Sequence, residues 1–325
     1  MKPCMLWTIV PLAVSVLAGC ATPRKQEEEA PRSLVRAGLA RAAKPFSFTT
    51  RASDHENRWI ALRPQKGEEA YPFGFVYIDP EAGFTFNLEG KLARDAEGKY
   101  TRVPIGIEGK GRVMVRLSAQ RNPPAALLTA EVIEQLGLPE TPDWLEYYAD
   151  RSDSITHRVR WGSHYNHVAA CQRALTYLEP VYQEKPDAEG IEFELAYAYN
   201  ELNRPAEAIT VLKQGMARHP DDILLGSELA FAYANAGMPD AAVQLYLKLI
   251  PRCGENDKLR KSEMAANLAS LYSRVGDAPN AKKWIDNAKA WEPPGVEMFT
   301  CANQDGSTCA PGEPGCRCVV NQHPQ

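Results

Sequence analysis

Cysteine is the residue type whose spacing in this sequence most directly suggests chemistry. Four of the eight cysteines, Cys301, Cys309, Cys316 and Cys318, flank or follow a Gly/Pro-rich stretch at residues 310–315. Such a stretch buries little apolar surface, so two disulfides would stabilise it by restricting its unfolded states. Four thiolates could alternatively bind zinc. Four cysteines allow three pairings, of which Cys316 with Cys318 is sterically the least favourable.

A further cysteine, Cys20, ends a short apolar segment at the N-terminus. Lys2 precedes an apolar run over residues 5–18, which Pro11 interrupts and which is too short for a permanent membrane span. The run ends in Leu17-Ala18-Gly19-Cys20, which resembles the lipobox of bacterial lipoproteins. That resemblance implies removal of residues 1–19 as a signal peptide and attachment of acyl chains such as palmitate to Cys20. The alternative is an ordinary secretory signal followed by a cysteine.

The residues after Cys20 fit an exported, lipid-anchored protein. Ala21, where some lipoproteins have aspartate, resembles the pattern of lipoproteins sent to the outer membrane of Gram-negative cells. The polar composition of residues 20–45 predicts a flexible tether. Cys171 and Cys253 bring the remaining cysteines to six, and an even number in an exported chain favours disulfides over a zinc site. The sequence does not decide whether Cys171 and Cys253 pair.

Composition and missing motifs exclude several classes of function. The 325 residues are 44% hydrophobic and 24% charged, with a net charge of −4 and no block of Lys or Arg, so nucleic-acid binding is not expected. No zinc-protease, serine-hydrolase, phosphate-loop or dinucleotide motif is present, and Gly106, Gly109 and Gly111 have the wrong spacing for the last of these. His157, His164 and His167 share a helical region but are most simply surface residues. We therefore expect no metal, cofactor or catalytic residue.

A period of 34 residues organises the second half of the chain. Tyr165, Tyr199 and Tyr233 follow this spacing. Small residues lie before and after the tyrosine in each copy and predict close helix pairing, because short side chains let a second helix approach. They are Gly162, Ala196, Ala230 and Ala269 in the first helices and Ala174, Ala208, Ala242 and Ala281 in the second.

This pattern resembles the tetratricopeptide repeat (TPR) family over residues 155–293. It departs from the family at residues 157–160, which are less apolar, and at Gly254, where proline is expected before an insertion at residues 255–261. The resemblance implies about four helix pairs in a solenoid whose first helices line a protein-binding groove. On the inner face it places Asn166, Phe193, Tyr197, Asn200, Phe231, Asn235, Ser270 and Arg274. Alternatively, Phe193, Tyr197 and Phe231 only pack against one another.

The region between the predicted tether and the repeats has the sequence pattern of β-strands. Residues 71–78 and 83–88 alternate apolar and polar or smaller side chains around turn residues 79–83, which predicts a hairpin. We expect a β-rich domain at 46–120 with one solvent-facing side, and linking helices at 121–154. Further strands are expected at 59–62, 100–104 and 112–117, and helices at 129–136 and from Thr141.

The predicted fold class is therefore α+β: a small antiparallel β-rich domain, an α-helical TPR-like solenoid and a Cys-rich tail at 294–325. The predicted function is a membrane-anchored scaffold of the cell envelope that binds an unknown envelope protein or peptide. The alternative is a ligand-binding or enzymatic β-rich domain that the repeats support. A third hypothesis is self-association through the repeats.

Overall fold

The computed structural model describes residues 45–103, 113–149, 152–254 and 256–292, with the backbone of 299–302 and 317–320. These residues belong to one compact unit, Ala42–Gln325. The predicted signal sequence, Cys20 and all but the last residue of the predicted tether lie outside the described residues. Among the described residues no helix is both long enough and apolar enough to cross a membrane.

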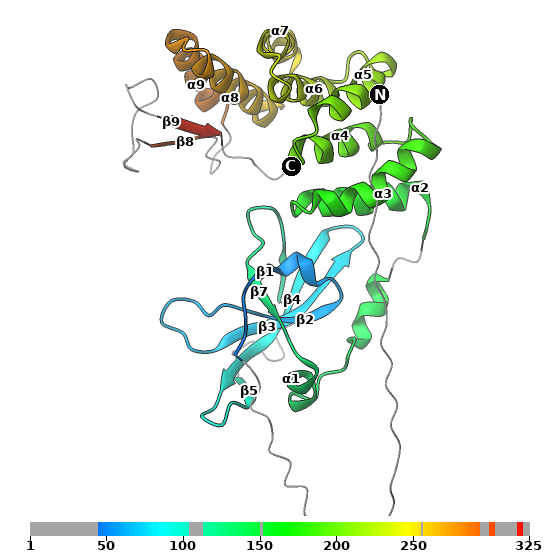
Figure 1. Ribbon diagram of the computed structural model, residues 1–325, viewed down its shortest axis with the longest axis vertical. Helices are drawn as coiled ribbons and strands as arrows, with labels where there is room; N and C mark the ends of the chain where they lie inside the picture. The colour runs from blue at the N-terminus through cyan, green and yellow to red at the C-terminus, as the bar shows by residue number, and fades with distance from the viewer. Residues whose placement is uncertain are drawn as a thin grey trace, which may run out of the picture. The chain divides into compact units, whose positions relative to one another are not determined.

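A seven-stranded antiparallel sheet forms the first part of the fold, as the sequence predicts (Figure 1). Its strand order is β1-β7-β2-β3-β4-β5, and β6 also pairs with β4. The strands are β1 (Thr50–Arg51), β2 (Arg58–Leu62), β3 (Tyr71–Asp79), β4 (Gly83–Arg94), β5 (Tyr100–Val103), β6 (Val113–Arg116) and β7 (Pro124–Leu127).

The hairpin of β3 and β4 is the centre of this sheet. Its turn closes because Asp79 Oδ1 accepts the backbone N–H groups of Glu81 and Ala82, at 2.9 and 3.2 Å. Gly83 completes the turn at φ +77°, a conformation that glycine adopts without strain. The predicted hairpin is confirmed, although β4 continues well beyond the alternating segment that predicted it.

The sheet is buried on both sides, contrary to the expectation of one solvent-facing side. One face carries Val76 and Ile78, which pack in the cluster that includes the first repeat. The other carries Phe75 and Tyr77, which pack beneath the short helices α1 (Ala130–Gln135) and η2 (Asp143–Tyr148). Strand β3 is apolar at successive positions, not only at alternate ones, because helices cover both of its faces.

Two features between residues 120 and 150 differ from expectation. Strand β7 lies in the segment expected to hold only linking helices and pairs with β2 and β1, so the sheet continues beyond residue 120. The segment after Thr141 forms the 3-10 helix η2, with Pro142 in extended conformation at its cap and no side-chain cap hydrogen bond. The expected helix at 129–136 is present as α1, and Thr129 caps it by accepting the N–H of Val132.

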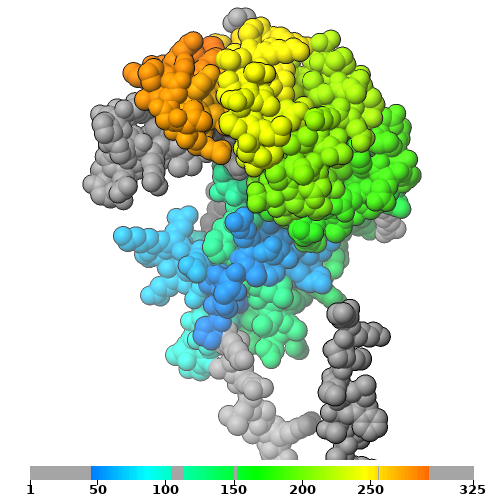
Figure 2. Space-filling model, turned by 45° about the horizontal axis from the view of Figure 1, so that its top comes forward, coloured from blue at the N-terminus to red at the C-terminus, as the bar shows by residue number. Residues whose placement is uncertain are grey.

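Four helix pairs follow in the described part of the chain, as the 34-residue period predicts (Figure 1). Figure 2 shows this region as successive bands of colour, from green through yellow to orange. The small first-helix residues are buried, and a Cβ added to Gly162 would lie 2.4 Å from Leu178 Cδ2. The pairs are α2 (Ile155–His167) with α3 (Cys171–Glu184), α4 (Ile191–Glu201) with α5 (Pro205–Arg218), α6 (Ile223–Asn235) with α7 (Pro239–Leu249), and α8 (Lys258–Arg274) with α9 (Ala278–Trp291).

The insertion before the fourth pair lengthens that pair's first helix. A 3-10 turn, η3 (Ile250–Arg252), follows α7, and α8 begins at Lys258 and runs for 17 residues. The departure from the repeat pattern around Gly254 therefore adds structure between pairs without breaking the stack. Strands β8 (Phe299–Ala302) and β9 (Arg317–Val320) form a separate antiparallel pair after α9.

Candidate functional site

Two asparagines connect successive first helices. Asn166 Nδ2 of α2 donates to Glu194 Oε2 of α4 at 2.8 Å and to the Glu194 carbonyl at 2.9 Å. Asn200 Nδ2 of α4 repeats the contact one pair later, donating to Glu228 Oε1 of α6 at 2.6 Å. Together with Tyr197 and Phe231, these four residues are called the first-helix face below. The contacts fix the spacing of adjacent repeats, because buried polar groups hold their partners closely.

The two carboxyl groups of this face ionise with difficulty. Desolvation raises the pKa of Glu228 to about 7, against the hydrogen bond from Asn200, and the nearby charges of Glu201, Glu194 and Glu263 raise it further. Desolvation also raises the pKa of Glu194, while hydrogen bonds from Asn166 and Ser163 oppose the shift. The ion pairs between described residues include neither Glu194 nor Glu228, so hydrogen bonds from neutral groups are what stabilise their charges.

The residues predicted for the groove differ in exposure. Phe193 is buried, with its ring 6.2 Å from that of Tyr197, while Tyr197, Phe231 and Ser270 are half-buried. Asn235 and Arg274 are exposed.

Asn166 and Asn200 are only 3% and 5% exposed, and their N–H donors already bind glutamates. Their N–H groups therefore already have partners, whereas the Oδ1 atom of each has none among the described residues, so a peptide hydrogen bond at these positions would be to Oδ1. Sequence reasoning missed Glu194 and Glu228 as members of this face. Their own separation of 34 residues was the signal that could have identified them.

The sheet is joined to the first repeat by a second polar cluster. Glu56 accepts the hydroxyl of Tyr165 and pairs with Arg173 at 3.2 Å, and the Arg173 guanidinium lies 4.5 Å from the Tyr165 ring centre. Nearby, His164 Nε2 lies 3.1 Å from the Pro80 carbonyl of the β3–β4 turn. Val168, the C-cap residue of α2, is buried at this junction. Val275 is the equivalent C-cap residue of α8, and it is 62% exposed.

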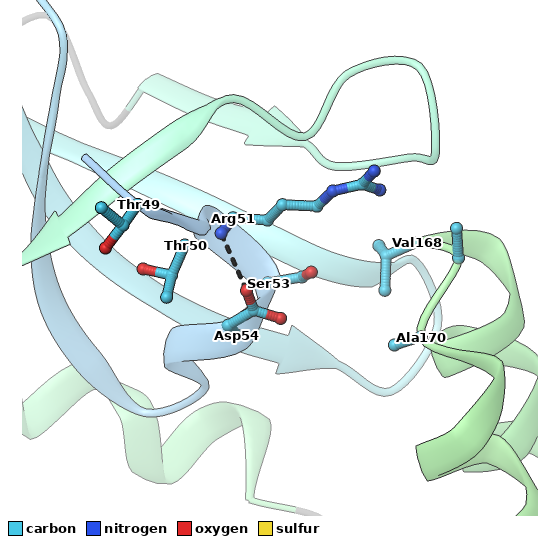
Figure 3. Close-up of a pocket in the computed structure, with 8 residues that line it drawn as sticks. Thr49, Thr50, Arg51, Ser53, Asp54, Val168 and Ala170 are labelled. Carbon is cyan, nitrogen blue, oxygen red and sulfur yellow. Dashed lines mark hydrogen bonds between the residues drawn. The ribbon is translucent and has the colours of Figure 1, made fainter.

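A cavity of about 420 Å³ lies at the same junction (Figure 3). Thr49, Thr50 and the start of the 3-10 helix η1 (Ala52–His55) line one side of it, and residues 168–170 of the α2–α3 turn line the other. Asp54 is already engaged there, since its Oδ2 accepts the Arg51 backbone N–H at 2.8 Å. The cavity has polar and apolar walls but no catalytic arrangement among its lining residues.

Histidine and cysteine do not form a reactive centre in the described ranges, where no cluster of three or more His, Cys, Asp or Glu could hold a metal. The His157 ring stacks 4.0 Å from Trp161, and His164 contacts the sheet. Cys171 and Cys253 are both buried free thiols in separate hydrophobic clusters, so they do not pair with each other. The predicted tail disulfides involve side chains outside the described residues.

A match to a family model supports the repeat assignment. The tetratricopeptide repeat family model matches residues 171–227. Among solved structures, MamA from Desulfovibrio magneticus RS-1 shares 15% identity over 51% of this chain and 87% of its own, with a TM-score of 0.39. A thermophilic TPR protein from Thermus thermophilus shares 19% identity over 46% of this chain and 79% of its own, with the same TM-score of 0.39. No curated protein matches the chain.

Proposed function

We propose that this chain, which carries tetratricopeptide repeats, is a protein-binding scaffold that acts through the first-helix face. The observation that carries the proposal is the coupling of successive first helices by Asn166–Glu194 and Asn200–Glu228. It gives adjacent repeats a fixed spacing and places two half-buried aromatic side chains, Tyr197 and Phe231, on the same face. Half-buried aromatics on a rigid support are typical of binding surfaces, because they bury a large area with little loss of side-chain entropy.

In this proposal the sheet caps the first end of the repeat array. Each repeat leaves an apolar side that its neighbour must cover, so terminal repeats need a cap. The sheet meets this need at α2, where Phe84 of β4 lies 5.2 Å from Tyr165, ring centre to ring centre. The contacts of Glu56 and His164 hold it there.

We further propose that lipid on Cys20 anchors the scaffold in the cell envelope, at the outer membrane if the cell is Gram-negative. The support is the sequence Leu17-Ala18-Gly19-Cys20 and the polar segment that follows it. Membrane fractionation of wild type and Cys20→Ser tests the anchor. The variant is expected in the soluble fraction or uncleaved, and a cleaved variant that still sediments with membranes would disprove lipid anchoring.

The scaffold role is tested by photo-crosslinking in cells. A photo-reactive residue in place of Phe231 is expected to capture a discrete partner protein. The matched control is Leu247 of α7, which is 42% exposed on a second helix. Equal capture of the same proteins at both positions would contradict binding through the first helices.

The cavity favours one alternative, a small-molecule site at the sheet. Its volume of about 420 Å³ is within the range of ligand pockets. A thermal-shift screen of metabolites against wild type and Thr50→Trp, which would fill the cavity, tests it. A ligand that stabilises wild type but not the variant would support the alternative, and equal stabilisation of both would remove it.

A further inference from the structure

Acidic side chains gather on the first-helix face and beside it. Four glutamates from three different helices, Glu194, Glu201, Glu228 and Glu263, lie close enough for the other three to raise the pKa of Glu228. Glu194 and Glu228 occupy equivalent positions in successive repeats. Their carboxyl groups accept hydrogen bonds from neutral side chains. Adding a negative group to this face would be unfavourable, and adding a positive group would relieve repulsion that is already present.

The asparagines provide a second, independent indication of a missing partner. Asn166 and Asn200 are more than nine-tenths buried, and each uses its amide N–H to bind a glutamate of this face. Within the described part of the chain, the Oδ1 atom of each has no hydrogen-bond partner. Buried amide oxygens are rarely left in this state, and N–H donors are the groups that would satisfy them.

Tyr197 supplies the apolar component beside these polar groups. The charges of Glu201, Glu228 and Glu194 all raise the pKa of its hydroxyl, after the larger effect of burial, so its side chain lies among the carboxylates. Its aromatic neighbour one repeat later is Phe231. A long aliphatic stem that ends in a cation matches this combination, because the stem packs on a ring while the cation meets the carboxylates.

We propose that the first-helix face binds a lysine- or arginine-bearing segment of a partner protein, with the cationic group between Glu194 and Glu228. This inference rests on the proposed scaffold function and specifies the chemistry of its partner. Binding of the cation requires Glu228 to be ionised. The affinity therefore falls as the pH drops below about 7, where Glu228 takes up a proton. Desolvation also raises the pKa of Glu194, so protonation of Glu194 acts in the same direction.

The test uses the full chain and three labelled peptides of equal length, in which alanine alternates with lysine, serine or glutamate. The expected result is that only the lysine peptide binds and that added salt weakens its binding. Glu194→Gln/Glu228→Gln is expected to bind it at least about tenfold more weakly, a loss of about 1.4 kcal/mol. The control is Asp187→Asn/Glu189→Gln, which removes the same charge from two exposed residues of the α3–α4 turn and is expected to bind like wild type.

Two outcomes would overturn the inference. One is equal loss of binding in the two double variants, which would mean that net charge alone attracts the peptide. The other is equal binding to wild type and Glu194→Gln/Glu228→Gln.

The photo-crosslinking partner separates this inference from the scaffold function. A partner captured at Phe231 through a segment without Lys or Arg would refute the cation site and leave the scaffold role standing, whereas absence of any partner there would count against both.

Discussion

Replacing Glu228 by glutamine is expected to stabilise the unbound protein at neutral and alkaline pH. The glutamine oxygen can still accept the Asn200 N–H, which lies 2.6 Å from Glu228 Oε1, but no charge has to be desolvated. The shift from 4.5 to about 7 sets the size of the effect. At 1.36 kcal/mol per pKa unit the upper bound is about 3 kcal/mol, and because the side chain is only half-buried we expect about 1–2 kcal/mol.

The sign of the pH dependence follows from proton uptake. Because the folded pKa is above the unfolded value, the folded state binds more protons between about pH 4.5 and about pH 7. The contribution of Glu228 to stability is therefore fully present below about pH 4.5 and is lost as the pH rises to about 7. The advantage of Glu228→Gln should be small near about pH 4.5 and reach its maximum above about pH 7.

Urea denaturation of wild type and Glu228→Gln across this pH range measures the difference in free energy of unfolding. Glu189→Gln serves as the control, because it makes the same chemical change at an exposed position in the same array. A Glu228→Gln protein that is no more stable than the control above about pH 7, or whose advantage does not shrink in acid, would refute the assignment of a desolvated carboxylate.

Three further predictions follow from other parts of the fold. Gly74→Ala should lower the free energy of unfolding by about 3 kcal/mol or more in denaturation experiments, since its Cβ would lie 2.0 Å from a backbone oxygen of β4. Tyr165→Phe should cost about 1–2 kcal/mol and expose the sheet–repeat junction to limited proteolysis, because it removes the hydroxyl that binds Glu56, and unchanged cleavage would contradict that role. Cys301 and Cys318 are direct register partners of β8 and β9. Non-reducing peptide mapping should therefore find them in one disulfide, and a different pairing would exclude it.

Much of the repeat array could be predicted because its information is local and periodic. The small residues and tyrosines spaced by 34 identify helix pairs without any knowledge of the rest of the chain. The β3–β4 hairpin was predictable for the same reason, since alternation and turn residues act over a few positions. Strand β7 was not, because Pro124–Leu127 has too little pattern of its own and becomes a strand only by pairing with β2.

The candidate site, like the fold, could be predicted only in part from the sequence. The sequence alone predicted which helices would carry the face and placed the aromatic pair Tyr197 and Phe231 on it, but it did not identify Glu194 and Glu228. It did not determine that Asn166 and Asn200 would turn inward to glutamates of the next repeat, because that depends on how closely two helices pack. The raised pKa of Glu228 is likewise a tertiary property. It arises from desolvation and from charges on helices far apart in sequence, and only the folded array brings these groups within electrostatic range.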